Sequence, residues 1–330
     1  MYKLTMPLDV GSLHLTNRLV MPPMATAKAE KDGTAGGSLI DYYAEKSLGG
    51  YLGLIIIEHS YVSPLGQASL GQLSVAGERT VPGLRRLAQE IHRNGPKTVM
   101  QINHAGSATS EEVIRETPVG PSAVANPRKG GLPRELNHEE IAQIIESFAE
   151  AARRVKEAGF DGVEIHAAHG YLLNQFFSPL TNRRLDEYGG ELRSRLRLHL
   201  EVLEAVRGAV GPDYPVLMRW GASDCTEGGV TLKESCRAAR YLAEAGLDIL
   251  DISGGMCGYS VPGLNAQGYF APWAAAIKQA VSLPVILTGG ITEAMAAERL
   301  LEENKADLIG VGRALLNDSA WAGKAMESLI

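Results

Sequence analysis

Two histidines and a tyrosine lie close together in the segment His-Ala-Ala-His-Gly-Tyr at residues 166–171. The residues directly before them, Gly-Val-Glu-Ile at 162–165, form a short aliphatic run that is typical of a buried strand. His166, His169 and Tyr171 all form hydrogen bonds, and such side chains are unfavourable in a core unless they are paired. We therefore predict that these three side chains lie at the end of a strand and belong to an active site.

The chain alternates short aliphatic runs with longer amphipathic segments. The short runs predict strands at residues 18–22, 53–58, 97–102, 162–166, 216–220, 248–253, 285–288 and 307–311. The amphipathic segments predict helices at residues 39–48, 82–93, 138–158, 192–210, 232–245, 272–281 and 292–303. Eight strands that alternate with helices are typical of a (β/α)8 TIM barrel, an α/β fold, rather than of a doubly wound sheet. No linker divides the chain, so we expect one domain over residues 1–330.

Two connections are much longer than the others, at residues 103–136 and 167–190. Loops of more than about 12–15 residues in a compact domain are usually functional or disordered. Both follow the C-terminal end of a predicted strand, which is the face where barrel enzymes build their active sites. We expect the first connection to carry a hairpin excursion after the third strand. In the second, Arg184, Asp186 and Tyr188 are expected to brace the loop.

Composition and charge exclude several classes of function. The 330 residues have a formal net charge of −6 and no basic run, which argues against a nucleic-acid surface. The three cysteines are widely spaced without a CxxC motif, so we expect no disulfide framework, iron–sulfur centre or zinc site. The N-terminus lacks the apolar core of a signal peptide, and the longest aliphatic run, residues 52–57, is too short to cross a bilayer. We therefore expect a cytoplasmic protein without a nucleic-acid or membrane partner.

Other predicted strands also end in residues that could bind a ligand. Pro22-Pro-Met24 follows the first strand, His59 follows the second, and Gln101 and Arg219 close the third and fifth. In a barrel these strand ends converge on one mouth. A glutamine, an arginine and two histidines in that mouth can bind a polar heterocycle and an oxyanion.

The last two predicted strands end in glycine-rich turns. Thr-Gly-Gly at 288–290 and Gly-Val-Gly-Arg at 310–313 each lead into a helix, an arrangement that forms the usual phosphate site of barrel enzymes. Arg313 adds a fixed positive charge to this site. Together with the polar strand ends, the two turns predict a phosphorylated ring cofactor.

Two other interpretations of these residues stay open. His166 and His169 could ligate a metal in a hydrolase or lyase, although no glutamate follows His166 as in HExxH and no third ligand is suitably spaced. The barrel could also be a non-catalytic binder of a phosphorylated ligand. We expect no metal.

Four segments, in this order, resemble the old yellow enzyme family of FMN-dependent ene-reductases, and the resemblance spans nearly the whole chain. They are Asn-Arg-Leu-Val-Met-Pro-Pro-Met at 17–24, Gly-Leu-Ile-Ile-Ile-Glu at 53–58, Gln-Ile-Asn-His-Ala-Gly at 101–106 and the long stretch at 158–190. The last part of that stretch, Asn-Gln-Phe-Phe-Ser-Pro-Leu-Thr-Asn-Arg-Arg at 174–184, is the most specific. The chain is most similar to the bacterial thermophilic-type branch and to the barrel module of 2,4-dienoyl-CoA reductases.

The resemblance implies that FMN is the cofactor. Gln101 would bind the pyrimidine edge, and Arg219 would lie near N1 and O2, where its charge stabilises the reduced flavin. The phosphate would be held by Gly290, Gly312 and Arg313. The residues that lie beside the flavin would be Pro22, Pro23, Met24, Ala25 and His59.

The same resemblance implies an NADPH dehydrogenase of the old yellow enzyme type, which reduces activated C=C bonds of α,β-unsaturated carbonyl or nitro compounds. NADPH or NADH and the substrate would use one face of the flavin in turn, in a ping-pong cycle. His166 and His169 would donate hydrogen bonds to the substrate oxygen while hydride leaves flavin N5 for the β-carbon. Tyr171 would then protonate the α-carbon, because a phenol with an ordinary pKa near 10 is protonated at neutral pH.

A second function implied by the resemblance is that of a barrel subunit in a larger dienoyl-CoA or enoate reductase system. In both cases we expect a small-molecule substrate and a homo-oligomer. Four positions depart from the family pattern: Ala25 replaces a frequent Cys or Thr, Ala27 a frequent Tyr, His59 a small residue, and Ser107 an Arg that is common after His-Ala-Gly. These departures predict a different flavin potential and substrate range.

Overall fold

Eight parallel strands close into a barrel in the computed structural model, which describes residues 2–128, 131–261 and 263–329; both ends of the expected domain range 1–330 lie outside it. The barrel strands are β3 (Leu19–Met21), β4 (Leu54–Tyr61), β5 (Lys97–Asn103), β8 (Gly162–Ala167), β9 (Val216–Gly221), β10 (Ile249–Ser253), β11 (Val285–Thr288) and β12 (Leu308–Gly310). They pair in the order β10-β11-β12-β3-β4-β5-β8-β9. Each overlaps a predicted strand, which confirms the (β/α)8 TIM barrel.

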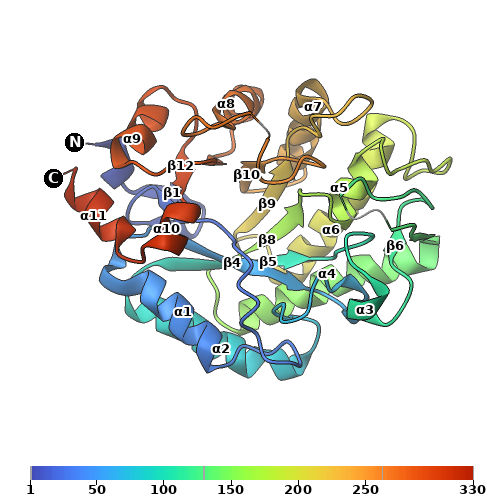
Figure 1. Ribbon diagram of the computed structural model, residues 1–330, viewed down its shortest axis with the longest axis horizontal. Coiled ribbons are helices and arrows are strands. Elements are labelled where there is room, and N and C mark those ends of the chain that lie inside the picture. Colours follow the sequence, from blue (N-terminus) through green and yellow to red (C-terminus); the bar gives the residue numbers. More distant parts are fainter. Residues whose placement is uncertain (1, 129–130, 262, 330) are drawn as a thin grey trace.

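Helices surround the barrel (Figure 1). Those that match a predicted segment are α1 (Gly37–Ser47), α2 (Val81–Arg93), α4 (His138–Glu157), α6 (Leu192–Val210), α7 (Leu232–Glu244), α8 (Ala271–Ala280) and α9 (Ala294–Glu302). Shorter ones are α3 (Glu111–Ile114), α5 (Leu172–Phe177), α10 (Arg313–Asn317), α11 (Trp321–Glu327) and the 3-10 turns η1 (Lys3–Thr5), η2 (Leu48–Gly50), η3 (Pro64–Gly66) and η4 (Glu78–Thr80). Seven amphipathic segments thus became helices, and their apolar faces cover the sheet.

A β-hairpin that the sequence analysis did not predict closes the N-terminal end of the barrel. Strands β1 (Leu8–Val10) and β2 (Leu13–Leu15) pair antiparallel. Leu13 and Leu15 are buried against the inward-facing apolar side chains of the barrel strands, which are Val20, Leu54, Ile56, Val99, Leu217, Ile249, Ile286 and Leu308. This apolar layer fills the part of the barrel interior next to the hairpin.

The prediction of a hairpin in residues 103–136 is wrong. β6 (Val119–Gly120) and β7 (Arg134–Glu135) do pair, but the pairing is parallel. The chain must therefore return to the same end before β7 begins, which a tight hairpin turn cannot do. Arg184 favours this arrangement, because its Nη1 donates to the backbone oxygens of Pro121 at 3.0 Å and Leu136 at 2.6 Å, just beyond each strand.

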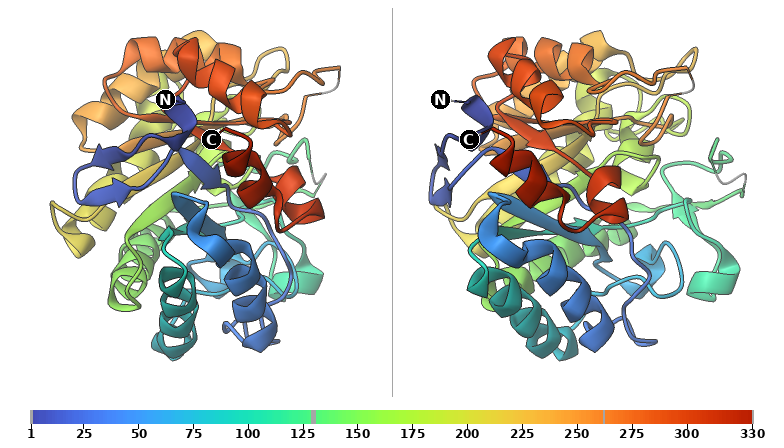
Figure 2. Two further views of the ribbon diagram at one scale, coloured as in Figure 1. Left: turned by 90° about the vertical axis from the view of Figure 1, so that its left-hand side faces the viewer. Right: turned by 60° about the vertical axis from the view of Figure 1, so that its left-hand side comes forward.

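The second long connection is braced as expected. Arg184 Nε lies 3.0 Å from both Asp186 carboxylate oxygens, and Asp186 also accepts the backbone N–H of Tyr188 at 3.1 Å. Figure 2 shows the excursion at residues 103–136 and the hairpin β1–β2 at opposite ends of the barrel. In the part of the chain that the structure describes, no helix is long and apolar enough to span a membrane.

Candidate active site

Four aromatic side chains gather where β8 and β4 end. The ring centroid of His166 lies 4.9 Å from that of His169 and 4.9 Å from that of Tyr171, both edge to face. The ring of His59 stacks on Tyr171 with centroids 5.2 Å apart, and it lies 6.1 Å from His166. The structure thus brings together His166, His169 and Tyr171, and it adds His59 to this group.

His166 is a neutral hydrogen-bond donor. Its Nδ1 accepts the backbone N–H of Ala168 at 3.3 Å, so the proton of the neutral imidazole belongs on Nε2. Burial, together with the charges of the neighbouring histidines, lowers the pKa of His166 well below its usual value. An uncharged ring with a fixed Nε2–H can donate to a carbonyl oxygen without releasing its proton.

His169 is held in an unusual backbone conformation. Its φ of 61° lies in the left-handed region, which non-glycine residues seldom adopt, and its N–H donates to the Gly254 oxygen at 3.1 Å. Its Nε2 and the Ser253 Oγ lie 2.7 Å apart in a hydrogen bond. Contacts with β10 therefore set the position of this ring, and a strained residue at a strand end is common in functional sites.

The His59 ring, at β4, is oriented by the loop that follows this strand. Gln72 Nε2 donates to His59 Nδ1 at 2.9 Å, while Gln72 Oε1 accepts the Ala68 N–H at 2.7 Å and so fixes the amide orientation. Nδ1 is therefore an acceptor, and the neutral ring carries its proton on Nε2. Burial lowers the pKa of His59 to about 4. The role of His59 beside the flavin stays a prediction, and its observed neighbour is Tyr171.

Tyr171 retains its proton. Its side chain is half-buried, and this burial raises the pKa of the phenol above its usual value, against the opposing effect of Arg128. Among the described residues, none forms a hydrogen bond with its hydroxyl group. A protonated phenol without a protein partner is available to a ligand in the barrel mouth.

Gln101 and Arg219 belong to a polar network inside the upper barrel. Gln101 Nε2 donates to Glu164 Oε2 at 2.6 Å, and Arg219 Nη1 donates to Asp251 Oδ2 at 2.5 Å. Strand register explains the pairs, because Gln101 lies beside Glu164 and Arg219 lies beside Asp251 in neighbouring strands. Gln101 and Arg219 are thus each held in place by a buried carboxyl group.

Glu164 and Asp251 are not among the site residues predicted from the sequence. Burial and the neighbouring Asp251 charge raise the pKa of Glu164 well above its usual value, and burial raises that of Asp251 to about 6. Glu164 Oε1 and Asp251 Oδ1 are buried without a partner among the described residues, and a proton held by Glu164 would supply one. Both acids alternate with apolar residues along their strands, which was the available signal for an inward position.

The two glycine-rich turns meet at the ends of β11 and β12. Gly290 has a φ of +68°, and a Cβ on it would lie 2.9 Å from the Tyr269 ring and 3.4 Å from an Arg313 Nη atom. A Cβ on Gly312 would lie 3.1 Å from Met24 Sδ. Gly290, Gly312 and Arg313 therefore lie together as predicted residues of one cradle, and the segment after β3 borders it.

The segment after β3 contains the other predicted flavin neighbours. Pro22 is buried, Pro23 and Met24 are half-buried, and Ala25 is exposed. Their roles stay predictions.

A buried carboxyl group anchors the segment after β3. Thr26, directly after Ala25, donates its hydroxyl proton to Glu58 Oε2 at 2.5 Å. Burial raises the pKa of Glu58 to about 7, although the hydrogen bonds from Thr26 oppose the change. The strand end of β4 therefore holds the segment in place.

These residues fit FMN. Arg219 Nε is a buried donor without a hydrogen-bond partner among the described residues, as expected for a group that awaits a ligand acceptor. The lack of a side chain at Gly290 lets the Tyr269 ring and an Arg313 Nη atom lie close to its backbone, since a Cβ there would be 2.9 Å and 3.4 Å from them. Gln101 and Arg219 would hold the ring, and Gly290, Gly312 and Arg313 the phosphate.

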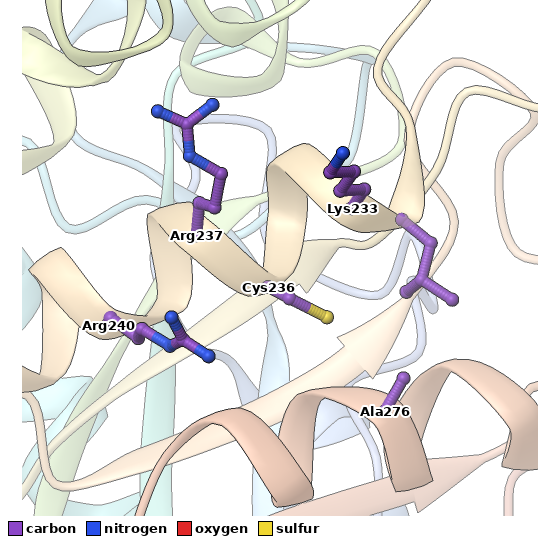
Figure 3. Close-up of a pocket in the computed structure, with 6 residues that line it drawn as sticks. Lys233, Cys236, Arg237, Arg240 and Ala276 are labelled. Atoms are coloured by element: carbon purple, nitrogen blue, oxygen red, sulfur yellow. The ribbon is translucent and has the colours of Figure 1, made fainter.

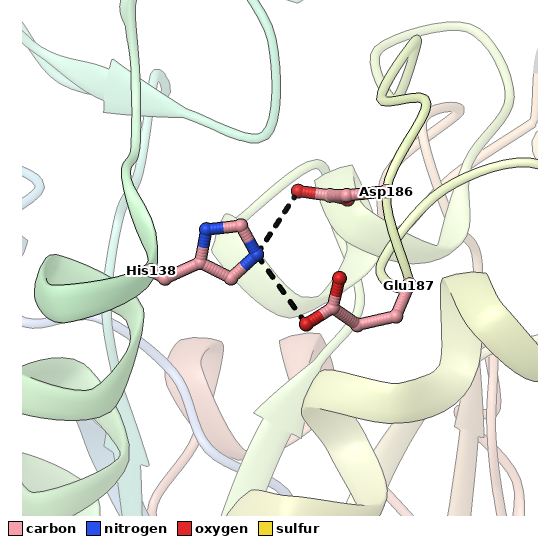
Figure 4. A group of neighbouring side chains, drawn as sticks. All are labelled: His138, Asp186 and Glu187. Atoms are coloured by element: carbon pink, nitrogen blue, oxygen red, sulfur yellow. Dashed lines mark ion pairs between the residues drawn. The ribbon is translucent and has the colours of Figure 1, made fainter.

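An ion-pair cluster and a cavity lie outside this site. His138 Nε2 lies 3.3 Å from Asp186 Oδ2 and 3.4 Å from Glu187 Oε1 (Figure 4), but Arg184 already occupies the Asp186 carboxylate. This cluster is an ion-pair group of the braced loop. A cavity of about 470 Å3 lies between α7 and α8 on the outside of the barrel (Figure 3). It is lined by Leu232, Lys233, Cys236, Arg237, Arg240 and Ala276.

The fold and the strand-end groups define a class: (β/α)8-barrel enzymes that bind a phosphorylated ring cofactor at the C-terminal mouth. Residues 3–330 match the model of the NADH:flavin oxidoreductase / NADH oxidase family. The chain belongs to this family, the old yellow enzyme family. This confirms the prediction of an FMN-dependent NAD(P)H oxidoreductase, with FMN as cofactor and NADPH or NADH as reductant.

Individual relatives differ in length. The chain is 43% identical over 324 residues to an NADH oxidase of Thermoanaerobacter brockii, which covers 96% of this chain but 50% of that protein. It is 38% identical over 314 residues to an NADPH dehydrogenase of Clostridium acetobutylicum, with 94% of this chain and 90% of that protein covered. A 2-naphthoyl-CoA reductase in complex with 2-naphthoyl-CoA superposes with a TM-score of 0.94 at 29% identity, over 99% of this chain and 52% of that one. The chain thus spans about half the length of two of these three proteins.

Proposed function

We propose that this chain reduces the activated C=C bond of α,β-unsaturated carbonyl or nitro compounds with NADPH or NADH, and that residues 1–330 act as one FMN-binding barrel domain. The observation that carries the proposal is the grouping of the protonated Tyr171 phenol with the neutral His166 and His169 rings at one strand end. A proton donor beside two neutral hydrogen-bond donors suits a substrate that gains negative charge on oxygen and then a proton on carbon.

Each side chain has a distinct task in this proposal. FMN held by Gln101, Arg219, Gly290, Gly312 and Arg313 would supply the hydride-transfer chemistry, with NADPH or NADH as the source of the hydride. His166 Nε2–H donates to the substrate oxygen and stabilises the charge that develops there. His169, positioned by Ser253, would complete that pair, and Tyr171 delivers its proton to the α-carbon.

The test is a panel of acceptors offered to FMN-loaded protein with NADPH or NADH. The proposal expects steady consumption of the nicotinamide with cyclic enones, enals and nitroalkenes, and products saturated at the C=C bond by mass spectrometry. Saturated ketones should not be reduced. A protein whose bound flavin is reduced by NADPH but is reoxidised only by oxygen would contradict ene-reduction and leave the oxidoreductase class intact.

A second candidate is the barrel part of a larger dienoyl-CoA or enoate reductase system. The NADH oxidase and the 2-naphthoyl-CoA reductase, of which the chain covers about half, favour this candidate. It predicts that CoA thioesters of dienoic or aromatic acids are better acceptors than simple enones. A cytoplasmic location, a homo-oligomer and a small-molecule substrate also stay predictions.

A further inference from the structure

Arg128 places an exposed guanidinium group at the rim of the barrel mouth. It belongs to the excursion at residues 103–136, and its backbone N–H donates to Asn126 Oδ1 at 2.9 Å. The fully buried Asn126 donates in turn to the Gly170 oxygen at 3.1 Å and to Ser107 Oγ at 3.1 Å. Gly170 is the residue between His169 and Tyr171, so a buried amide ties Arg128 to the segment that carries the reactive side chains.

The side chain of Arg128 also lies close to Gly170, in the segment that carries His169 and Tyr171. A Cβ on Gly170 would lie 2.9 Å from Arg128 Cδ, and a Cβ on Gly258 would collide with Arg128 Nη1. Gly258 follows β10, beside the exposed Tyr259, whose ring centroid lies 6.1 Å from that of His169. Burial first, and then the charges of Arg219 and Arg128, lower the pKa of His169. Arg128 thus bridges the excursion and the loop after β10, within electrostatic reach of the site.

The guanidinium group of Arg128 has no protein partner among the described residues, neither a hydrogen bond nor an ion pair. Arg219, by contrast, is paired with Asp251, and Arg313 lies in the glycine cradle assigned to the flavin phosphate. A planar guanidinium binds phosphate oxygens in a bidentate manner and is less strongly hydrated than an ammonium group. One arginine at the mouth is therefore left for an anion that enters from solvent.

We propose that Arg128 binds the diphosphate of NAD(P)H while the nicotinamide ring occupies the mouth. One ribose separates the nicotinamide from the diphosphate, so a ring beside His166 and His169 leaves the diphosphate at the rim. The diphosphate is common to NADPH and NADH, so Arg128 contributes to the binding of both and does not select between them. The proposal rests on the proposed position of the flavin at the strand ends, and it is independent of the acceptor that the enzyme reduces.

The experiment compares wild type, Arg128→Ala and Arg128→Lys as FMN-loaded proteins, with Arg237→Ala as the matched control. Arg237 is an exposed arginine on α7, in the outer cavity of Figure 3. Equilibrium binding is measured by calorimetry with 1,4,5,6-tetrahydro-NADP, which cannot donate hydride. Flavin reduction is followed anaerobically with NADPH, with NADH and with 1-benzyl-1,4-dihydronicotinamide, a neutral hydride donor without phosphate.

Arg128→Ala is expected to weaken the binding of the analogue and of both dinucleotides about tenfold. Arg128→Lys should retain part of the affinity, and Arg237→Ala should match wild type. The second-order rate with the benzyl compound should not change in any variant. Unchanged affinity in Arg128→Ala, or an equal loss with the benzyl compound, would overturn the proposal. A protein that reduces no enone still yields all the nicotinamide measurements, so failure of the proposed function is recognised separately.

Discussion

Arg219 Nη1 and Asp251 Oδ2 lie 2.5 Å apart in the barrel interior, with both side chains buried. The carboxylate offsets part of the positive charge that Arg219 directs toward the predicted pyrimidine edge of the flavin. In a low-dielectric interior such a pair acts on a bound redox group more strongly than a surface pair does. We therefore expect the network of Arg219, Asp251, Glu164 and Gln101 to set both the position and the net charge of the predicted flavin site.

Replacing Asp251 by Asn should raise the reduction potential of bound FMN, because the unopposed Arg219 charge favours the anionic reduced form. A shift of about +30 mV corresponds to roughly 1.4 kcal/mol for this two-electron couple. Spectroelectrochemical titration measures it. Asp248→Asn is the control, since Asp248 forms a 2.6 Å ion pair with Arg207 just before the same strand, β10, at the opposite end of the barrel. Equal potentials in Asp251→Asn and wild type would show that the pair does not act on the flavin.

Replacing Tyr171 by Phe should slow reoxidation of the reduced flavin by an enone about 10²- to 10⁴-fold, the usual contribution of a positioned proton donor. Reduction of the flavin by NADPH should change little, since that step needs no proton from the phenol. Stopped-flow absorbance separates the two half-reactions. Tyr259→Phe serves as the control, because this exposed tyrosine contacts His169 edge to face. A Tyr171→Phe protein with wild-type reoxidation would refute the donor role.

Replacing Gly290 by Ala should weaken FMN binding at least tenfold. The Cβ would strain a φ of +68° and would lie 2.9 Å from the Tyr269 ring and 3.4 Å from Arg313. Gly159→Ala is the control, since Gly159 has a φ of +90° with no atom within 4 Å of the added Cβ, and so shares the backbone strain alone. Quenching of FMN fluorescence gives both affinities. If the two variants bind FMN equally well, the cradle is not the phosphate site.

Glu58 predicts a pH-dependent difference in stability. Its pKa in the folded protein is raised to about 7, so the stability it contributes is present in full below its unfolded pKa near 4.5 and is lost as the pH rises through about 7. Glu58→Gln cannot ionise and retains an oxygen for the Thr26 hydroxyl. The variant should therefore be more stable than wild type by about 3 kcal/mol at pH 8.5 and similar to it at pH 4.5. Denaturant unfolding at both pH values tests this, and a pH-independent difference would contradict it.

The barrel could be predicted because each barrel strand overlaps a short aliphatic run, and these runs alternate with amphipathic segments of helical length. The hairpin β1–β2 could not, since strands of three residues carry almost no periodicity. The prediction of a hairpin in the excursion is wrong for a related reason. The two-residue strands β6 and β7 have no pattern that distinguishes parallel from antiparallel pairing. There the direction depends on contacts from Arg184, more than 45 residues further along the chain.

The site residues also divide into those that could be predicted from the sequence and those that could not. His166, His169 and Tyr171 share one segment, so local spacing was enough to group them. Glu164 and Asp251 come from different strands, and their proximity depends on the closure and stagger of the barrel, which sequence spacing does not encode. Arg128 lies in a loop without regular structure, and its position depends on the Asn126 amide bound to Gly170.

We expect the mouth of this barrel to pass hydride from a nicotinamide to a conjugated C=C bond. Anaerobic double-mixing of FMN-loaded protein tests it most directly, first with NADPH and then with a cyclic enone, while flavin absorbance near 450 nm is followed. The absorbance should be lost in the first step and return in full in the second, with one equivalent of saturated ketone formed per flavin. A flavin that is bleached by NADPH and stays reduced with every enone and nitroalkene would contradict it.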